Sequence, residues 1–380
     1  MILIPEILFY LTFFLILNSF LIYPIVVYLL SRNKNKNIVA QSCEPTVSVL
    51  VAANELTAEQ IRKFEEIDYD KTKFELLVGI SSSSAEVDND VKNSQMKISF
   101  YENKKSNAEI LNDLSVKAAN EILLFINADT LFDKNILKTI TQNFTEPTVG
   151  GVCGKSLLID GEKNTIGYHP KNIFAQYKNL IEQAEDKCGV VINSGTEVFA
   201  IRRELYKSIP VEVPININLF SSLSVIEQSY KLTCTDKPIV YENRIKNYTI
   251  EYNQKISSAV SDFYTVSFFK NLFWNKNKFL SYAFLSCKIT ELSLPGLLLL
   301  LFLFSFLLAN ENLFISKIYF LQLAFYLLAL GGYLLSSINV QLTVFSLPYY
   351  FVMKNAAIAK GFIKFRKEKQ NANKLLTEIN

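Results

Sequence analysis

Three stretches of the chain are long, apolar and free of charged residues. They are Ile7 to Ser31, Leu292 to Ala309 and Ile318 to Ile338. A helix rises about 1.5 Å per residue, so stretches of about 17 to 25 apolar residues are long enough to cross a hydrocarbon core about 30 Å thick. The pattern predicts an N-terminal membrane anchor and a C-terminal helical membrane bundle.

A fourth apolar stretch, Val340 to Phe362, contains Lys354 and Lys360, and the tail that follows it is basic. It is open to three interpretations: a span, a re-entrant segment or an interfacial helix. Basic residues favour the cytosolic side of a membrane. Two C-terminal spans return a cytosolic chain to the cytosol, so we expect Val340 to Phe362 not to cross completely.

The N-terminal stretch is typical of an anchor that is retained. A secretory signal peptide has a basic start, a shorter apolar core and small residues at its end. This stretch follows acidic Glu6 and ends in large residues, and Arg32, Lys34 and Lys36 come directly after it. The positive-inside rule then places the next domain in the cytosol.

Residues 45 to about 250 alternate between strand-like and helix-like segments. Short apolar runs occur at Val47 to Val51, Phe74 to Ile80 and Glu121 to Ile126, and helical spacing occurs at Thr57 to Ile67 and Ala108 to Ala119. Strands that alternate with helices indicate an α/β fold with a parallel sheet covered by helices on both faces.

Ligands of such sheets bind beyond the carboxyl ends of the strands. The polar positions that follow the three apolar runs are Ala52 to Glu55, Ser81 to Glu86 and Asn127 to Thr130. We therefore expect the binding site to be built from these three segments.

Composition limits the alternatives. Half of the residues are hydrophobic, which is unusual for a soluble protein of 380 residues, and a net charge of +3 gives no argument for nucleic acid as a partner. No two of the five cysteines form a C-x-x-C pair, and His169 is the single histidine. Zinc sites, dithiol redox motifs and Ser/His/Asp triads are therefore disfavoured.

Aromatic residues mixed with lysines between Phe263 and Lys288 are typical of an amphipathic helix on a membrane surface. The expected organisation has four parts. These are a membrane anchor (1–36), a cytosolic domain (37–262), an interfacial region (263–291) and a transmembrane bundle with a basic tail (292–380).

Several segments, taken in their order along the chain, resemble the motifs of a known protein family. They are Tyr23-Pro24, Pro45 to Glu55, Phe125 to Leu131, Glu146 to Gly154, Phe199 to Leu205, Val225 to Lys231 and Pro348 to Tyr350. Together they resemble the family 2 glycosyltransferases, in particular the membrane-bound polysaccharide-synthase-like subgroup. The resemblance implies a GT-A-type nucleotide-diphospho-sugar transferase sheet domain with α-helical transmembrane segments.

The resemblance also implies a chemistry. Members of the family use a nucleotide-sugar donor, a divalent metal (Mg²⁺ or Mn²⁺) on its diphosphate and an aspartate base that deprotonates a hydroxyl of a glycan or lipid-linked acceptor. The metal would offset the charge of the leaving diphosphate, and the base must be within reach of the acceptor hydroxyl.

Transferred to this chain, the family pattern assigns three sets of residues. The donor-binding positions are Ala53, Glu55, Ser81, Asn107, Asn127 and Asp129. The acceptor-side positions are Gly195, Thr196, Arg202, Arg203, Glu227 and Gln228. Asn218 occupies the position of the catalytic base, with Glu197 as a substitute base, and Asp129 is the metal ligand that is retained.

The chain departs from the family where charge is required. Ser81 or Ser82 stands where the family has its first aspartate, and Asn127 stands where it has the first aspartate of its D-x-D motif. Asn107 stands where it has a lysine, and Asn218 replaces the catalytic aspartate. Asparagine keeps the shape and one acceptor oxygen of aspartate but neither its charge nor its basicity. Loss of a general base typically costs about 10²–10⁴ in rate.

Three hypotheses follow. The first is a catalytically impaired family member of cell-envelope or exopolysaccharide synthesis, acting as the non-catalytic partner of an active synthase. The second is a divergent active glycosyltransferase that uses Asp129 and a replacement base. The third is a membrane scaffold for glycan assembly. All three imply an integral protein of a bacterial inner membrane.

Overall fold

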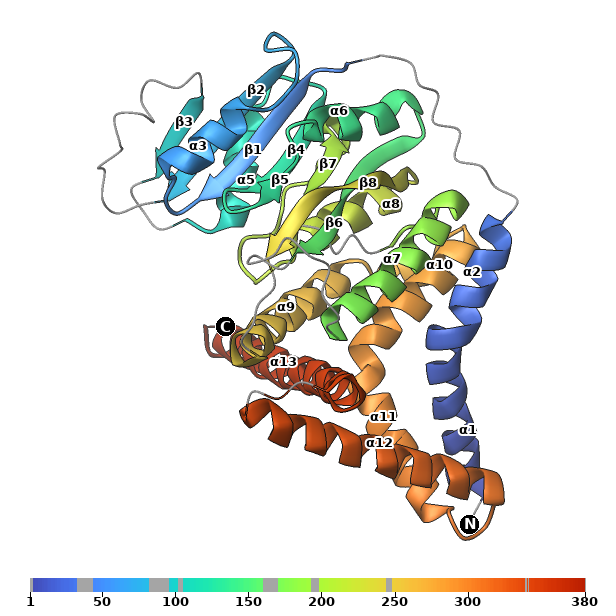
Figure 1. The fold of residues 1–380 in the computed structure, drawn as a ribbon. Coiled ribbons are helices and arrows are strands. Elements are labelled where there is room, and N and C mark those ends of the chain that lie inside the picture. Colours follow the sequence, from blue (N-terminus) through green and yellow to red (C-terminus); the bar gives the residue numbers. More distant parts are fainter. Residues whose placement is uncertain are drawn as a thin grey trace.

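The computed structural model describes residues 3–32, 44–81, 96–101, 105–159, 170–192, 198–243, 248–338, 340 and 342–379. Within them, an α/β domain stands on a group of long helices (Figure 1). The N-terminal helix and the last three helices make up this second part.

The sheet has eight strands in the described residues, in the order β3-β2-β1-β4-β7-β6-β8-β5. Strands β3, β2, β1 and β4 are parallel, as the sequence predicts, whereas β7 runs antiparallel to both of its neighbours. The strands are β1 (Val47–Ala53), β2 (Phe74–Ser81), β3 (Lys97–Tyr101), β4 (Ile122–Asn127), β5 (Leu131–Phe132), β6 (Val149–Ile159), β7 (Phe199–Arg202) and β8 (Lys231–Asn243).

Helices cover both faces of the sheet. Strand β1 is buried along its whole length, and its side chains alternate between two cores: Leu50 and Ala52 belong to one, and Val49 and Val51 belong to the other. This alternation is the period-two geometry of a strand. The covering helices are α3 (Ala58–Glu65), α5 (Asn107–Lys117), α6 (Ile136–Thr141), α7 (Pro170–Cys188) and α8 (Ile217–Glu227).

Three helical runs among the described residues are long and apolar enough to cross a membrane: Leu3–Ser31, Lys278–Leu307 and Leu313–Ser337. They contain the three uncharged stretches seen in the sequence almost completely. The helices are α1 (Leu3–Leu17), α2 (Tyr23–Ser31), α10 (Lys278–Phe284), α11 (Thr290–Leu307) and α12 (Leu313–Ser337), with π-helical turns joining α1 to α2 and α10 to α11.

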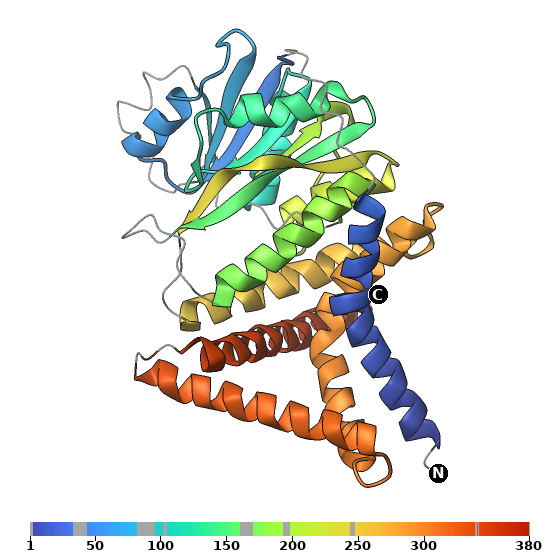
Figure 2. The same cartoon turned by 45° about the vertical axis from the view of Figure 1, so that its right-hand side comes forward.

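The fourth apolar stretch lies in α13 (Thr343–Ile379), which also includes the basic tail. It runs between α12 and α9 (Tyr248–Phe268), a helix below the sheet (Figure 2). Two glycines allow this close approach: a Cβ added at Gly332 would lie 2.3 Å from the backbone oxygen of Phe345, and one at Gly361 would lie 2.7 Å from the Cβ of Ala259.

A buried ion pair joins the two parts of the molecule. Lys288, in the turn before α11, lies 2.9 Å from the carboxylate of Asp262 on α9, and the two side chains are 3% and 8% exposed. Asp262 also accepts a hydrogen bond from Asn216, at the start of α8. Both charges are thus removed from water and satisfied by each other.

Breaking this pair on one side should destabilise the protein strongly. Lys288→Met leaves the Asp262 carboxylate buried without a cation, a change that typically costs about 3–5 kcal/mol. Thermal unfolding in detergent should show a large fall in Tm. Lys276→Met, at an exposed position nearby, should leave Tm nearly unchanged, and the double variant Lys288→Met/Asp262→Asn should recover part of the loss. Equal Tm values for Lys288→Met and Lys276→Met would contradict the role of the pair.

A second buried contact ties α2 to α7. The Tyr23 hydroxyl donates to Glu185 at 2.6 Å, and the Cys287 thiol donates to the same carboxyl oxygen at 3.0 Å. Burial raises the pKa of Glu185 to about 7, although the two hydrogen bonds lower it in part. The folded protein therefore holds a proton on Glu185 that the unfolded chain releases near pH 4.5.

Stability should fall as the pH rises through this window. Between about pH 4.5 and pH 7 the folded state binds more protons than the unfolded state, so deprotonation removes up to about 3 kcal/mol of stability. Glu185→Gln keeps an acceptor oxygen but cannot ionise, so its Tm should change less between pH 5.5 and pH 8 than that of the parent protein. The same pH dependence in both proteins would rule out Glu185 as its source.

Candidate active site

The expected donor positions meet at one edge of the sheet. Strands β2, β1 and β4 are neighbours whose register pairs Ala53 with Ile80 and Ala52 with Asn127. Their carboxyl ends, at Ala53, Ser81 and Asn127, therefore lie side by side. The Ser81 hydroxyl accepts a hydrogen bond from the backbone N–H of Lys105 at 3.0 Å. This bond brings the start of α5, with Asn107, to the same edge.

Asp129 completes this group. It is exposed, two residues after the end of β4, and its Oδ1 accepts a hydrogen bond of 2.7 Å from the amide of Gln60 on α3. Gln60 is itself oriented by the capping box of α3, because its Oε1 accepts from the backbone N–H of Thr57 at 2.8 Å. Glu55 lies exposed in the loop between β1 and α3.

The residues at this edge limit the kind of metal site that they can form. No three His, Cys, Asp or Glu side chains cluster as metal ligands anywhere in the described part of the chain. Mg²⁺ is commonly held by one or two carboxylates together with substrate phosphates. Asp129 beside a neutral Asn127 therefore fits a metal shared with a diphosphate and does not fit a cage made of protein ligands alone.

Two expected acceptor-side residues lie at the opposite edge of the sheet. Arg202 pairs with Ile122, the first residue of β4, because β7 is antiparallel. Its guanidinium donates to the backbone oxygens of Val149 at 2.8 Å and Phe144 at 2.9 Å. Arg203 likewise donates to a backbone oxygen, that of Ala118. Both arginines hold the amino edge of the sheet together.

Glu227 and Gln228 belong to this far edge as well. Glu227 pairs with Lys207 at 2.8 Å, and the amide of Gln228 donates to the backbone oxygen of Leu205. They brace the end of α8 against the turn that contains Arg203. The structure thus does not bring these four expected acceptor residues to the donor edge.

Asn218 lies at the other end of α8. The helix is about 15 Å long at 1.5 Å per residue, and it begins at Asn216, whose side-chain oxygen caps it by accepting from the backbone N–H of Leu219. Asn216 is fixed in turn by Asp262 of α9. The remaining expected residues, Gly195, Thr196 and Glu197, lie outside the described residues.

Sequence reasoning missed two features of this region. Gln60 orients Asp129 from a helix that no motif singled out. In addition, charged residues from distant segments gather where the domain meets the long helices: Lys178, Glu182, Lys255, Asp262, Lys288, Glu291 and Lys354. Burial, and next the charge of Lys354, lower the pKa of Lys255 to about 8. The signal available in the sequence was Lys288 and Glu291, three residues apart at the start of an apolar helix.

Comparison with known proteins supports the fold over nearly the whole chain. No family model matches. The structure of the mannosyltransferase PcManGT from Pyrobaculum calidifontis, solved with GDP-Man and Mn²⁺, superposes with a TM-score of 0.68 at 18% identity. The alignment covers 95% of this chain and 99% of that one. This likeness confirms the expected GT-A-type fold with long apolar helices.

A curated relative gives a more distant match. The O-antigen chain rhamnosyltransferase RfbN of Salmonella typhimurium is 21% identical over 136 residues, which is 34% of this chain. The match spans 42% of that protein's length.

The arginines at the far edge should matter for stability and not for ligand binding. Hydrogen bonds to charged groups are worth about 1.5–3 kcal/mol each, so the loss of two in Arg202→Met should lower the free energy of unfolding by at least about 3 kcal/mol. Its affinity for nucleotide should equal that of the parent protein. The exposed Arg62→Met is the matched control for both measurements. Reduced nucleotide binding with unchanged stability would show instead that Arg202 contributes to the nucleotide-binding site.

Proposed function

We propose that this protein is a membrane-bound glycosyltransferase. It transfers a sugar from a nucleotide-sugar donor to a glycan or lipid-linked acceptor at the membrane surface. The observation that carries the proposal is the carboxyl edge of the sheet, where Ala53, Ser81, Asn107, Asn127 and Asp129 come together in a GT-A-type fold. The glycosyltransferases named above support it.

The residues at the edge suit a nucleoside diphosphate in three ways. The N-terminus of α5 directs the positive end of the helix dipole to this edge, although its capping box, formed by Ser106 and the Glu109 carboxylate, already uses the backbone N–H groups of both residues. Ser81 and Asn127 offer neutral hydrogen-bonding groups. Asp129, held by Gln60, would be the protein ligand of a Mg²⁺ or Mn²⁺ ion, which would supply charge to the leaving diphosphate when bound.

The catalytic base of such an enzyme would differ from that of the family. Asn218 has no basicity, so a carboxylate must take its place for the acceptor hydroxyl to be deprotonated. Glu197 is the proposed substitute, because it belongs to the segment that leads directly into β7.

A second candidate function is favoured by the amides at Asn127 and Asn218. It is a non-catalytic subunit of cell-envelope or exopolysaccharide synthesis that binds a nucleotide sugar beside an active synthase. The two candidates agree on donor binding and differ only in turnover.

Donor binding and turnover therefore form one experiment. The full chain in detergent should bind one of GDP-mannose, UDP-linked and dTDP-linked sugars in a calorimetric titration, more tightly with Mn²⁺ than without it. Asp129→Asn should weaken this binding at least tenfold, whereas Asp68→Asn, at a position whose partner is Lys138 on the surface, should not change it.

The outcomes separate the candidates. Turnover with membrane lipid extract that Glu197→Gln abolishes supports the enzyme. Binding without turnover supports the partner subunit. A chain that binds no nucleotide sugar contradicts both.

The membrane orientation can be tested separately. We expect the α/β domain and the tail of α13 on the cytosolic side, with the loop between α11 and α12 outside. In a chain whose native cysteines are replaced by serine, a membrane-impermeant maleimide added to intact cells should label Glu311→Cys but not Lys367→Cys. Labelling of Lys367→Cys from outside would make α13 a full span.

A further inference from the structure

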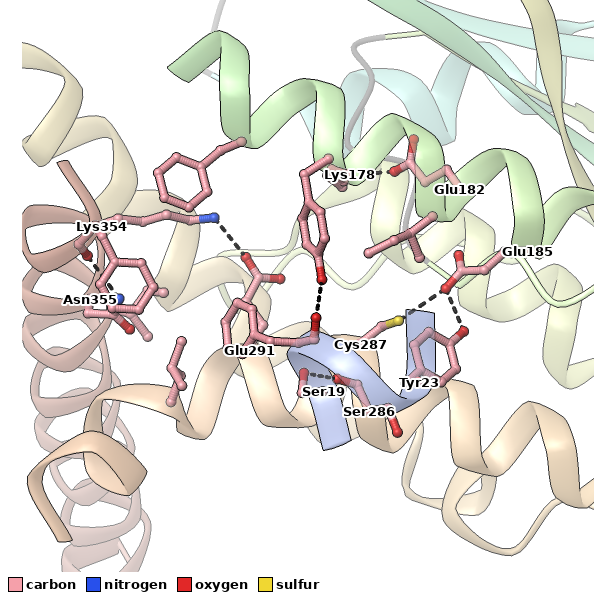
Figure 3. A pocket seen from close by; sticks show the side chains of 17 residues that line it. Ser19, Tyr23, Lys178, Glu182, Glu185, Ser286, Cys287, Glu291, Lys354 and Asn355 are labelled. Carbon is pink, nitrogen blue, oxygen red and sulfur yellow. Dashed lines mark hydrogen bonds and ion pairs between the residues drawn. The ribbon is translucent and has the colours of Figure 1, made fainter. Parts of the chain in front are cut away.

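A cavity of about 170 Å³ lies between the α/β domain and the long apolar helices (Figure 3). Its walls come from four separate parts of the chain: the α1–α2 run, α7, the start of α11, and α13. Side chains of mixed character line it. The aromatic ones are Phe20, Tyr23, Phe174, Tyr177 and Phe351.

The cavity lies at the level of a membrane surface if the long helices cross the membrane. About 20 helical residues cross a hydrocarbon core, and Tyr23 lies that far along the run that begins at Leu3. Glu291 is the second residue of α11 and precedes its long apolar part. Both residues line the cavity, so it opens where a lipid head group would lie.

One polar group in this cavity lacks the partner that its burial requires. Asn355 is 7% exposed, and its Nδ2 donates to the backbone oxygen of Phe351 at 2.8 Å. Its Oδ1 is buried and accepts no hydrogen bond from any residue that the structure describes. An unsatisfied buried acceptor costs about 1–3 kcal/mol, so this oxygen favours a ligand that donates a hydrogen bond.

The charges in the cavity disfavour an anion. Each lysine is paired with a carboxylate: Lys178 lies 3.4 Å from Glu182, and Lys354 lies 3.4 Å from Glu291. Glu185 adds a further carboxyl group, and burial raises its pKa and that of Glu182. A phosphate placed here would meet carboxylates without an unpaired cation, whereas an uncharged hydroxyl would find acceptors. The aromatic rings offer apolar faces beside them.

We propose that this cavity binds an uncharged, hydroxyl-bearing head group, a sugar or polyol, at the membrane surface. The proposal rests on the proposed function, since such a group would be the part of the acceptor nearest the membrane. Its source is either a lipid that carries the group or a soluble glycan. The cavity volume of about 170 Å³ suits one small head group.

The test measures ligand binding by native mass spectrometry on the full chain released from mixed micelles. One arm offers monoglucosyl-diacylglycerol, a second offers soluble maltose, and a third offers phosphatidylcholine, whose head group has no hydrogen-bond donor. The glucosyl lipid should be retained about tenfold more than phosphatidylcholine. Retention of maltose to the same extent would identify a soluble glycan as the source.

Substitutions at Asn355 and at a control position test whether the lipid binds in this cavity. Asn355→Leu removes the acceptor oxygen and should reduce the preference about three- to tenfold, the effect of one hydrogen bond. Asn143→Leu is a close control: Asn143 is also buried, its Nδ2 also bonds four residues back and its Oδ1 is also unsatisfied, but it lies in the α/β domain. A Tm measurement on each variant excludes unfolding as the cause.

Equal retention of the glucosyl lipid and phosphatidylcholine, or equal loss in Asn355→Leu and Asn143→Leu, would overturn the proposal and leave a cavity that holds water only. Nucleotide-sugar binding is measured on the same samples. Failure of the proposed function shows as lost donor binding in the parent protein, and failure of this inference shows as lost lipid preference with donor binding intact.

Discussion

The position of the α/β domain relative to the long helices depends on the ion pair between Lys288 and Asp262. Lys288 precedes an apolar helix and Asp262 lies on α9 below the sheet, so each buried charge is stabilised by an opposite charge, and Lys288 also lies 3.7 Å from Glu291. Asp262 also holds Asn216, which caps α8. One buried ion pair thus connects a helix long enough to cross a membrane with α8, the helix that carries Asn218.

This connection gives the sheet a fixed orientation relative to the long helices. Two further contacts act in the same direction: Tyr23 with Glu185, and Tyr350 with Glu251 at 2.8 Å. Each joins a long helix to a polar group at the junction.

The donor edge combines a retained framework with altered charges. Ser81, Asn107 and Asn127 are neutral, whereas the family that the sequence resembles has charged groups at the matching positions. The backbone of the edge is intact, with three adjacent strand ends and a capped helix. Asp129 keeps a carboxylate at this edge, and Gln60 orients it.

The sequence by itself determined the features that depend on local patterns. Uncharged apolar stretches identified the three long helices, and apolar runs followed by polar residues identified β1, β2, β4 and the edge where they end. It did not determine which edge Arg202 and Arg203 reach, because that depends on β7 running antiparallel to β4, and strand direction is set by contacts between segments far apart in the chain. The grouping of Lys178, Glu291 and Lys354 around one cavity was decided in the same way. Burial pairs charges by proximity in space, and no spacing along the sequence records that proximity.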